Sequence, residues 1–523
     1  MRLRSTRREM LLGAAAAALA PALPRFARAD DTKTGSPRVV RVEYKSVKEQ
    51  VAALRARRVS ARELTERSIA RIEALDAKLN AVVVRDFDRA RAAAVEADKA
   101  LARGERGPLL GVPMTVKESF NVAGLPTTWG FPRGRDFRPS EDALAVQRLK
   151  AAGAIVLGKT NVPVNLGDFQ SYNEIYGTTN NPWDVTRTPG GSSGGAAASL
   201  AAGYVLLELG SDIGGSLRNP AHFCGVLAHK PSRGLLPPRG HTPPGGLAIP
   251  YEVDLAVIGP MARTADDLST ALDVLAGPDE PQAVAYRLAL PPSRQRALKN
   301  YRVLVIDEHP LLPTSADVRA ALDHTAKGLE NAGVTVARSS PLVPDLALQG
   351  RTYSRLLSSM FGADIPDDAY ARVQEMAKAL PADDVSLPSE QVRGTVLSHR
   401  DWIRADRVRT RLTDSWRRLF RAFDVVLCPI MPTAAFPHDH SERARRRIAI
   451  DDKTVPYFDQ LMWAGVATLT GLPATAMPIG RSAAGLPIGA QCIGPYLEDR
   501  TPIQFAALAE RELGGFVPPP GYE

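Results

Sequence analysis

Two kinds of apolar pattern alternate along the chain. Ser60 to Glu63 has the sequence of a capping box, in which the Ser and Glu side chains satisfy the first free backbone amides of a helix. Apolar residues then recur at helical spacing, which predicts a helix through Leu75. Similar patterns predict helices over residues 88–103, 143–151, 318–330 and 504–512. Short apolar runs, typical of buried strands, lie at residues 155–157, 303–306, 334–337 and 425–428.

The alternation of these elements predicts an α/β protein. Strands that are buried on both faces read as near-continuous apolar runs, so we expect a central mixed, mostly parallel sheet with helices on both faces. No Ser/Gly-rich or Pro-rich linker divides the 523 residues, and no internal repeat is found. We therefore expect a single large domain, in keeping with a composition of 44% hydrophobic and 24% charged residues.

The first 29 residues have the pattern of an export signal. Arg7 and Arg8 form a twin arginine that is followed by a mildly hydrophobic, Ala-rich stretch over residues 11–23. Ala27-Arg28-Ala29 is a candidate cleavage site. We expect a twin-arginine-type signal over residues 1–29, a mature domain over residues 30–523, and an exported protein that is periplasmic or secreted. The alternative is a basic N-terminus without a targeting role.

The charge and the cysteines narrow the class of protein. Residues 1–29 carry six arginines against one glutamate, so only +4 of the formal net charge of +9 lies in the rest of the chain. The densest remaining basic run, residues 443–447, has no interleaved aromatic residues, so we expect no nucleic-acid partner. No segment predicts a stable membrane span. The three cysteines lack CxxC spacing, so we expect neither a disulfide framework nor a thiolate metal site.

Two Gly-rich segments that contain Ser carry the strongest signals of function. Residues 188–195 read Thr-Pro-Gly-Gly-Ser-Ser-Gly-Gly, and residues 210–220 read Gly-Ser-Asp-Ile-Gly-Gly-Ser-Leu-Arg-Asn-Pro. A phosphate-binding loop would need a Lys after the glycines, and neither segment has one. A nucleophile elbow would need a strand that leads into Ser192 and a downstream His, for which His438 and His440 are candidates. A purely structural role of the glycines also stays open.

Taken together, the two segments also fit a site for acyl transfer. A nucleophilic Ser needs a base that removes its proton and fixed donors that receive the oxyanion. The backbone N–H groups of residues 213–216 could form such a site around Ser216. Lys117 lies on a short apolar run that would bury its amine and lower its pKa, so that it could act as the base. Alone, a Lys beside an acid is more typical of a surface ion pair.

Three segments closely resemble the amidase signature family. The Lys motif of the family is similar to residues 111–117, its Gly/Ser loop to residues 190–195, and its nucleophile segment to residues 212–218. Lys117 lies 75 residues before Ser192, which lies 24 residues before Ser216, and this spacing fits the family. The resemblance is dense over about residues 105–265 and 460–512 and looser over about residues 270–455.

The resemblance implies the amidase signature fold and a Ser–Ser–Lys triad without a metal or an organic cofactor. Neutral Lys117 would accept a proton from Ser192, which family members hold on a cis peptide bond, and Ser192 would deprotonate the nucleophile Ser216. Ser193 would orient Lys117, and Asp212 and Arg218 would form a supporting charge pair. The oxyanion hole would consist of the backbone N–H groups of Ile213, Gly214, Gly215 and Ser216.

The implied function is hydrolysis of the C–N bond of a small-molecule carboxamide through an acyl-enzyme on Ser216. The products are an amine or ammonia and a carboxylic acid. The alternatives are an esterase or carbamate hydrolase with the same triad, or a non-catalytic or amidotransferase-type subunit. A monomer and a homodimer both fit the sequence.

The looser region, about residues 270–455, is expected to build the acyl pocket. Its apolar residues suggest an apolar or aromatic acyl group, although a packed amphipathic helix would have the same pattern. The residues in question are Tyr353, Leu356, Leu357, Met360 and Phe361. The chain also departs from many family members, because residues 467–471 contain no Asn and Val164 stands where an acidic residue is common.

Overall fold

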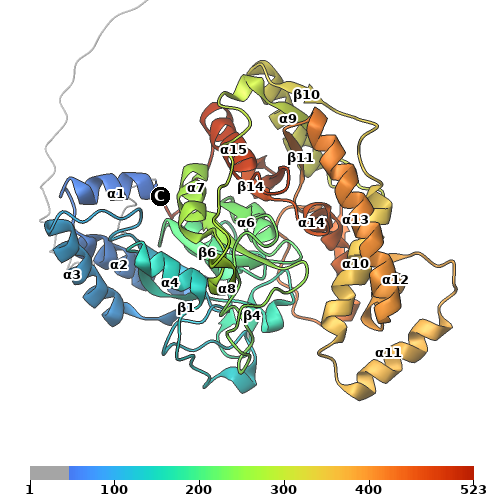
Figure 1. Cartoon of the computed structure of the whole chain (residues 1–523), viewed down its shortest axis with the longest axis horizontal. Coiled ribbons are helices and arrows are strands. Elements are labelled where there is room, and N and C mark those ends of the chain that lie inside the picture. The colour runs from blue at the N-terminus through green and yellow to red at the C-terminus, as the bar shows by residue number, and fades with distance from the viewer. Residues whose placement is uncertain (1–45) are drawn as a thin grey trace, which may run out of the picture. The chain divides into compact units, whose positions relative to one another are not determined.

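A large mixed sheet forms the centre of the protein in a computed structural model that describes residues 46–523 (Figure 1). The export signal expected over residues 1–29 lies outside the described residues. The sheet has 11 strands. In spatial order they are β1 (Val82–Arg85), β3 (Ile155–Thr160), β2 (Pro113–Lys117), β6 (Leu207–Asp212), β8 (Val257–Ala262), β7 (Leu227–Lys230), β14 (Ala474–Arg481), β15 (Pro487–Ile493), β11 (Val425–Pro429), β9 (Arg302–Val305) and β10 (Thr335–Ala337).

The parallel pairs of this sheet form two blocks. One block is β3, β2 and β6, and the other is β11, β9 and β10. Between the blocks, β8, β7, β14 and β15 pair antiparallel with their neighbours, and β1 is antiparallel to β3 at the edge. The predicted α/β domain with a mixed central sheet is therefore confirmed. Its middle is more antiparallel than the alternation indicated. For β14 and β15 the short connection between them permits only antiparallel pairing.

Helices cover the sheet. The helices are α1 (Val47–Arg55), α2 (Ala61–Leu79), α3 (Phe87–Ala102), α4 (Leu144–Ala151), α5 (Gly194–Ala201), α6 (Arg218–Cys224), α7 (Ala265–Leu275), α8 (Glu280–Ala283), α9 (Ala316–Asn331), α10 (Leu346–Gly362), α11 (Asp367–Ala379), α12 (Leu387–Thr395), α13 (His399–Ala422), α14 (Leu461–Thr468) and α15 (Arg500–Leu513). α2 and α3 pack against the first block of parallel strands, and α6 and α15 pack against β14 and β15. α10, α12 and α13 lie side by side beyond the other block (Figure 1).

Two small hairpins complete the described elements. They are β4 (Tyr172–Asn173) with β5 (Gly177–Thr178), and β12 (Arg447–Ile450) with β13 (Lys453–Pro456). Each pairs antiparallel and lies outside the central sheet.

The predicted helices are present at nearly the predicted bounds. The capping box forms at the start of α2, where the Glu63 N–H donates to Ser60 Oγ at 3.0 Å and the Ser60 N–H donates to the Glu63 carboxylate at 2.8 Å. The helical patterns at residues 88–103, 143–151, 318–330 and 504–512 correspond to α3, α4, α9 and α15. α15 starts earlier than predicted, because Pro502 lies in its first turn, where a helix tolerates the missing N–H.

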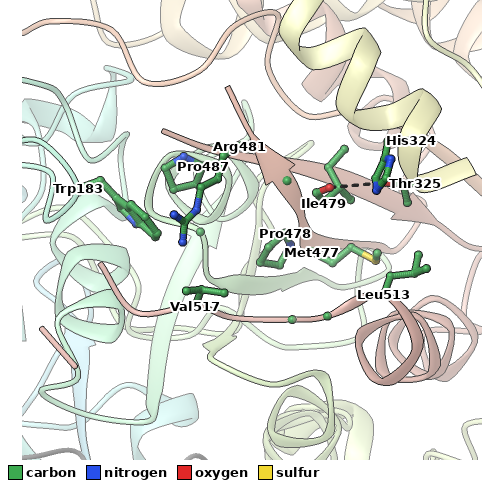
Figure 2. A pocket seen from close by; sticks show the side chains of 14 residues that line it. Trp183, His324, Thr325, Met477, Pro478, Ile479, Arg481, Pro487, Leu513 and Val517 are labelled. Atoms are coloured by element: carbon green, nitrogen blue, oxygen red, sulfur yellow. Dashed lines mark hydrogen bonds between the residues drawn. The ribbon is translucent and has the colours of Figure 1, made fainter. Parts of the chain in front are cut away.

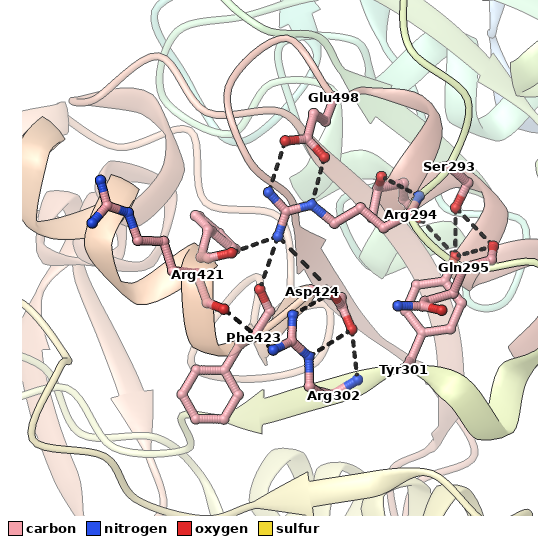
Figure 3. Close-up of polar contacts among 11 residues, drawn as sticks. Ser293, Arg294, Gln295, Tyr301, Arg302, Arg421, Phe423, Asp424 and Glu498 are labelled. Atoms are coloured by element: carbon pink, nitrogen blue, oxygen red, sulfur yellow. Dashed lines mark hydrogen bonds and ion pairs between the residues drawn. The ribbon is translucent and has the colours of Figure 1, made fainter.

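A cluster of charged side chains lies at the end of the sheet that contains β9 and β11 (Figure 3). It includes a side chain from the segment before β9. Arg294 Nη2 donates to the Glu498 carboxylate at 2.7 Å. Arg302 Nη2 lies 2.8 Å from the Asp424 carboxylate, whose side chain is 1% exposed. Each carboxylate of this cluster therefore has a guanidinium partner.

Several sequence-based expectations concern absences in the described part of the chain. Within residues 46–523, no helix is both long and apolar enough to cross a membrane. The same residues contain no group of three or more His, Cys, Asp and Glu side chains placed to hold a metal ion. Cys224, Cys428 and Cys492 are free and buried.

Candidate active site

The Lys117 side chain lies at the carboxyl end of β2, inside the first parallel block. β2 pairs with β6 so that Thr115 is opposite Glu208, and every residue of β2 is buried. The Lys117 side chain is buried and its amine Nζ lies 2.7 Å from Ser192 Oγ and 2.9 Å from Ser211 Oγ. Parallel strands place their carboxyl ends at one edge, so this geometry brings together residues that are 75 and 94 positions apart.

Ser192 lies on the loop that leads into α5. The peptide bond between Gly191 and Ser192 is cis. Two side chains hold the loop in place, since the Gly191 N–H donates to Asn219 Oδ1 at 3.1 Å and the Gly194 N–H donates to Ser171 Oγ at 3.0 Å. No strand leads into Ser192, so the nucleophile elbow considered for this loop does not form.

Ser216 lies in the turn between β6 and α6. The Ser193 N–H donates to the Ser216 carbonyl oxygen at 3.2 Å, which joins this turn to the Ser192 loop. Ser216 is 7% exposed, whereas Ser192 is 1% exposed, so Ser216 is the more accessible of the two. The turn therefore places the less buried Ser216 at the cavities beside a more deeply buried Ser–Lys pair.

The backbone of this turn differs in one respect from the predicted oxyanion hole. The Gly215 N–H donates to Asp212 Oδ1 at 3.0 Å, so it is already engaged. Gly215 has a φ of +96°, a conformation that glycine adopts readily. The candidate donors are therefore the N–H groups of Ile213, Gly214 and Ser216, for which no acceptor is found among the described residues. Of the four predicted donors, the Gly215 N–H is thus the one that already has an acceptor in the described structure.

Ser211, rather than Ser193, contacts the Lys117 amine directly. Ser193 Oγ donates to the Ser211 carbonyl oxygen at 3.4 Å and accepts from the Ser211 N–H at 3.5 Å. Ser193 thus holds the backbone of the residue whose hydroxyl contacts the Lys117 amine. A Cβ on Gly210 would lie 2.7 Å from Leu217 Cδ2 and 2.9 Å from Ser193 Oγ, so a side chain here would require both neighbours to shift.

Burial shifts the pKa of the Lys117 amine. Burial lowers this pKa from 10.5 to about 7, although the nearby carboxylates of Asp212 and Glu208 raise it. Glu208 is itself buried, and its burial raises the pKa of its carboxyl from 4.5 to about 8. Lys117 can therefore carry a neutral amine near neutral pH, which a general base requires.

Asp212 and Arg218 form the expected charge pair below the turn. Arg218 Nη2 lies 2.8 Å from Asp212 Oδ1, and both side chains are at most 1% exposed. Burial opposes ionisation of Asp212, but Arg218 outweighs it and the pKa of Asp212 falls to about 2. Arg218 also donates to Gln491 Oε1 at 2.7 Å and to Thr468 Oγ1 at 2.9 Å. These contacts fix the start of α6 directly after Ser216.

Ser216 lines two cavities that share part of their walls. The first has a volume of about 490 Å³ and is also lined by Ser192 and Ser211, and the second has a volume of about 470 Å³ and is also lined by Gly214. The first has the apolar residues Trp129, Ile249, Tyr251, Val253 and Met360 in its wall. The second has Phe169, Leu357, Phe458 and Leu461, and Phe361 lines both cavities.

The apolar residues predicted for an acyl pocket fall into two groups, one that lines the cavities at Ser216 and one that is packed in the core. Leu357, Met360 and Phe361 line the cavities at Ser216. Tyr353 and Leu356 are 0% exposed and belong to the core, as in a packed amphipathic helix. Tyr353 also donates from its hydroxyl to the Ile213 carbonyl oxygen at 2.8 Å, so it holds the backbone of the turn.

Several residues of the site were not predicted from the sequence. Ser211 could have been found, because it stands next to Asp212 in the nucleophile segment. Ser171 and Asn219 reach the Ser192 loop only through the tertiary fold, and the sequence around them does not indicate this contact. His438 and His440 line neither cavity. His438 Nε2 lies 3.0 Å from Asn180 Oδ1, and His440 stacks on Tyr172.

The fold and this arrangement of Lys and Ser define the class of the protein. The sequence profile of the Amidase family matches residues 63–502, and the chain therefore belongs to the amidase signature family. It is 33% identical over 517 residues to the A subunit of glutamyl-tRNA(Gln) amidotransferase from Anaeromyxobacter sp. strain K, covering 91% of this chain and 97% of the relative. It is 34% identical to the corresponding protein from Thermosynechococcus vestitus, covering 86% and 94%.

Solved structures of similar fold include amide-cleaving enzymes. A bacterial aryl acylamidase of the family matches with a TM-score of 0.75 at 25% identity, over 90% of this chain and 97% of that chain. A 6-aminohexanoate cyclic dimer hydrolase with bound substrate matches with a TM-score of 0.71 at 25% identity, over 90% and 97%. A protein from a vestigial complex, studied for the origins of an s-triazine catabolic enzyme, matches with a TM-score of 0.76 at 29% identity, over 90% and 99%.

Proposed function

We propose that this protein hydrolyses a carboxamide C–N bond with Ser216 as the nucleophile, Ser192 as the proton relay and Lys117 as the base. The observation that carries the proposal is the 2.7 Å contact between the buried Lys117 amine and Ser192 Oγ, beside the more accessible Ser216. A base whose pKa lies near 7 is neutral at the pH where an amide hydrolase must act.

In the first step, the Ser216 oxygen forms a bond to the carbonyl carbon. The Ser216 proton passes to Ser192, and the Ser192 proton passes to the Lys117 amine. The carbonyl oxygen gains negative charge and is received by the N–H groups of Ile213, Gly214 and Ser216. The intermediate then collapses, the C–N bond breaks, and the leaving amine takes a proton back through Ser192. Water repeats the sequence on the acyl-enzyme and releases the carboxylic acid.

The two cavities at Ser216 favour a secondary amide over a small primary amide. Each is large enough for a substantial group, and both have apolar walls. An anilide with an alkyl or aryl acyl group would place its acyl part in one cavity and its ring in the other. A primary amide would leave one cavity without a ligand and would lose that apolar contact.

This proposal is tested by comparing hexananilide with hexanamide as substrates of the purified chain. We expect kcat/KM for the anilide to be higher by about tenfold or more, which corresponds to the burial of one additional apolar group. Phe361→Ala, which removes a ring from both cavities, should reduce turnover of the anilide more than turnover of the amide. Equal values for both substrates in the parent chain would contradict the assignment of a secondary amide.

The second candidate function is that of an amidotransferase-type subunit. The amidotransferase A subunits that match at 33–34% identity over 86–91% of this chain support it. Such a protein would release ammonia from glutamine or another primary amide for a partner protein. Glutaminase activity that exceeds anilide turnover, or that appears only when a partner is added, would favour this candidate. An ester or a carbamate with the same acyl group would test the remaining alternative.

We also propose that the chain is exported through its twin-arginine signal. Arg7, Arg8 and the apolar stretch after them support this location. A fusion of residues 1–35 to a reporter that is active only outside the cytoplasm should give signal, and the Arg7→Lys, Arg8→Lys double variant should abolish it. Reporter signal that is unchanged in the double variant would contradict this route.

A further inference from the structure

A third cavity lies apart from Ser216. Its volume is about 350 Å³, and it shares no lining residue with the two cavities at the nucleophile. Its walls come from β14, the end of α6, α9, and the segment after α15. Figure 2 shows Trp183 and Arg481 at one end of this cavity and His324 and Thr325 at the other. The proposed hydrolysis assigns no role to it.

The Arg481 end of the cavity presents a positive charge without a negative partner. The guanidinium carbon lies 4.5 Å from the centre of the Trp183 ring, and Trp183 Nε1 donates to the Cys224 carbonyl oxygen at 2.9 Å. The ring is thus fixed and the guanidinium stacks on it. Within residues 46–523, the Arg481 side chain makes no ion pair or hydrogen bond, and no lining residue is acidic. The N–H donors of this guanidinium are therefore available to an acceptor from outside the chain.

Between the Arg481 end and the end formed by His324 and Thr325, the cavity wall is apolar. Pro478 and Met477 lie between the two ends, and Ile479, Leu513 and Val517 stand around them (Figure 2). Leu513 is 39% exposed and Val517 is 49% exposed, so these side chains present apolar surface to solvent. A ligand that covers them would remove this surface from water.

We propose that this cavity binds a small carboxylate with an aryl or alkyl tail. Arg481 would take the carboxylate through two parallel N–H donors, a geometry that a guanidinium fits well. The tail would lie across Pro478 and Met477 and cover Leu513 and Val517. The absence of any acidic residue in the wall favours an anion over a cation. A cavity of this volume accommodates a phenyl ring with a short chain.

The experiment is a calorimetric titration of the purified chain with 4-phenylbutyrate and with the neutral 4-phenyl-1-butanol. We expect saturable binding of the carboxylate and clearly weaker binding of the alcohol. Arg481→Gln should weaken binding of the carboxylate by about tenfold or more, because it removes a charge-assisted hydrogen-bond pair. Arg133→Gln is the matched control, since Arg133 is also exposed and stacks on a ring, that of Phe131, at 4.7 Å. It should leave the affinity within about twofold of the parent.

A second variant keeps the test independent of Arg481. Val517→Glu places a carboxylate on the exposed wall of the cavity, so it should also weaken binding of 4-phenylbutyrate while the circular dichroism spectrum stays unchanged. Equal affinity of the parent and Arg481→Gln would overturn the proposal, because the carboxylate would then bind without the Arg481 guanidinium. No saturable binding to the parent chain would overturn it as well. Neither result depends on amide hydrolysis, because the titration requires no turnover.

Discussion

Cationic side chains have different hydrogen-bond partners in two polar regions of this protein. In the cluster of Figure 3, the Arg302 guanidinium lies 2.8 Å from the Asp424 carboxylate, and Arg294 contacts Glu498 in the same manner. At the end of β2, the nearest partners of the Lys117 amine are two hydroxyls, at 2.7 and 2.9 Å. The first region pairs each guanidinium with a carboxylate. The second has no carboxylate in contact with the amine, so burial dominates and the pKa of Lys117 falls to about 7.

The comparison separates stabilising charges from a reactive one. Asp212 and Glu208 lie near enough to Lys117 to raise its pKa, but neither forms an ion pair with it. Asp212 is instead bound by Arg218 at 2.8 Å. Arg218, rather than Lys117, is thus the ion-pair partner of Asp212. Asp212 therefore makes no direct contact that would hold the Lys117 amine in its charged form. The same carboxylate fixes the turn that carries Ser216, through the Gly215 N–H.

The largest expected effect is on the nucleophile. Ser216→Ala should reduce kcat by about 10³-fold or more, because groups that act as one unit fail together. Ser415→Ala on the outer helix α13 should leave the rate within about twofold, since its hydroxyl donates only to the Arg411 carbonyl oxygen. The measurement is steady-state turnover of a neutral anilide. Substantial turnover by Ser216→Ala would show that another group attacks the carbonyl carbon.

The second prediction compares the loss of one cationic side chain in each region, with an effect on turnover in one region and on stability in the other. Lys117→Met should abolish turnover and leave the chain folded, because it removes a buried amine that has no carboxylate in contact. Arg302→Met should leave turnover nearly unchanged and lower the free energy of unfolding by about 1–2 kcal/mol, because Asp424 loses a partner. Arg302 is 44% exposed, which keeps this cost modest.

Activity assays and urea unfolding of both variants measure these outcomes. Each variant serves as the control for the other, since one changes the rate and the other changes the stability. Loss of stability without loss of rate in Lys117→Met would remove the basis of the comparison, because Lys117 would then act as a structural cation.

The sequence predicted the helices and strands better than it predicted which side chains contact one another at the candidate site. Apolar spacing located α3 and α9 to within two residues at each end. The Gly-rich segments located Ser192 and Ser216 because such turns need glycine whatever the rest of the chain does. Which hydroxyl meets Lys117 depends on the twist between β2 and β6, and no local pattern encodes that. The contact of Ser211 with Lys117 was therefore not predicted, and Ser193 contacts the backbone of Ser211.

The turn of residues 213–216 illustrates the same limit. Four consecutive N–H groups around Gly214 and Gly215 are visible in the sequence as candidate donors. Whether each is free depends on a side chain, and Asp212 engages the one at Gly215. The antiparallel middle of the sheet was equally hidden, since β7 and β8 are fully buried and read like parallel strands. Tertiary pairing, rather than residue pattern, decided their direction.

The third prediction concerns the pH dependence of kcat/KM. The pKa of Lys117 is lowered to about 7, so the amine is protonated and inactive below that pH and neutral above it. We expect kcat/KM for a neutral anilide to fall as pH decreases through about 7. Lys117→Arg should be inactive over the whole range, because a guanidinium does not release its proton. His241 lines the cavity, but burial lowers its pKa to about 3, so His241→Gln should leave this limb in place.

A control for folding accompanies the pH series. The fluorescence of the folded chain should stay constant between about pH 6 and pH 9, where the rate changes. A rate plateau that continues unchanged to about pH 6 would contradict Lys117 as the base and would require a group that ionises at lower pH.

The smallest expected effect comes from Glu208, the buried carboxyl on the strand beside Lys117. Its side chain is buried and its pKa is raised to about 8, so it is mainly neutral where Lys117 titrates. As pH rises above about 7, Glu208 ionises and its negative charge favours the protonated form of Lys117. The acid limb of the parent should therefore be broader than that of a single group. Glu208→Gln should make it steeper and move its midpoint to lower pH, while Asp267→Asn, at a second buried acid that accepts from the Val47 N–H, should leave it unchanged. An identical limb in Glu208→Gln and the parent would show that this carboxyl does not influence the base.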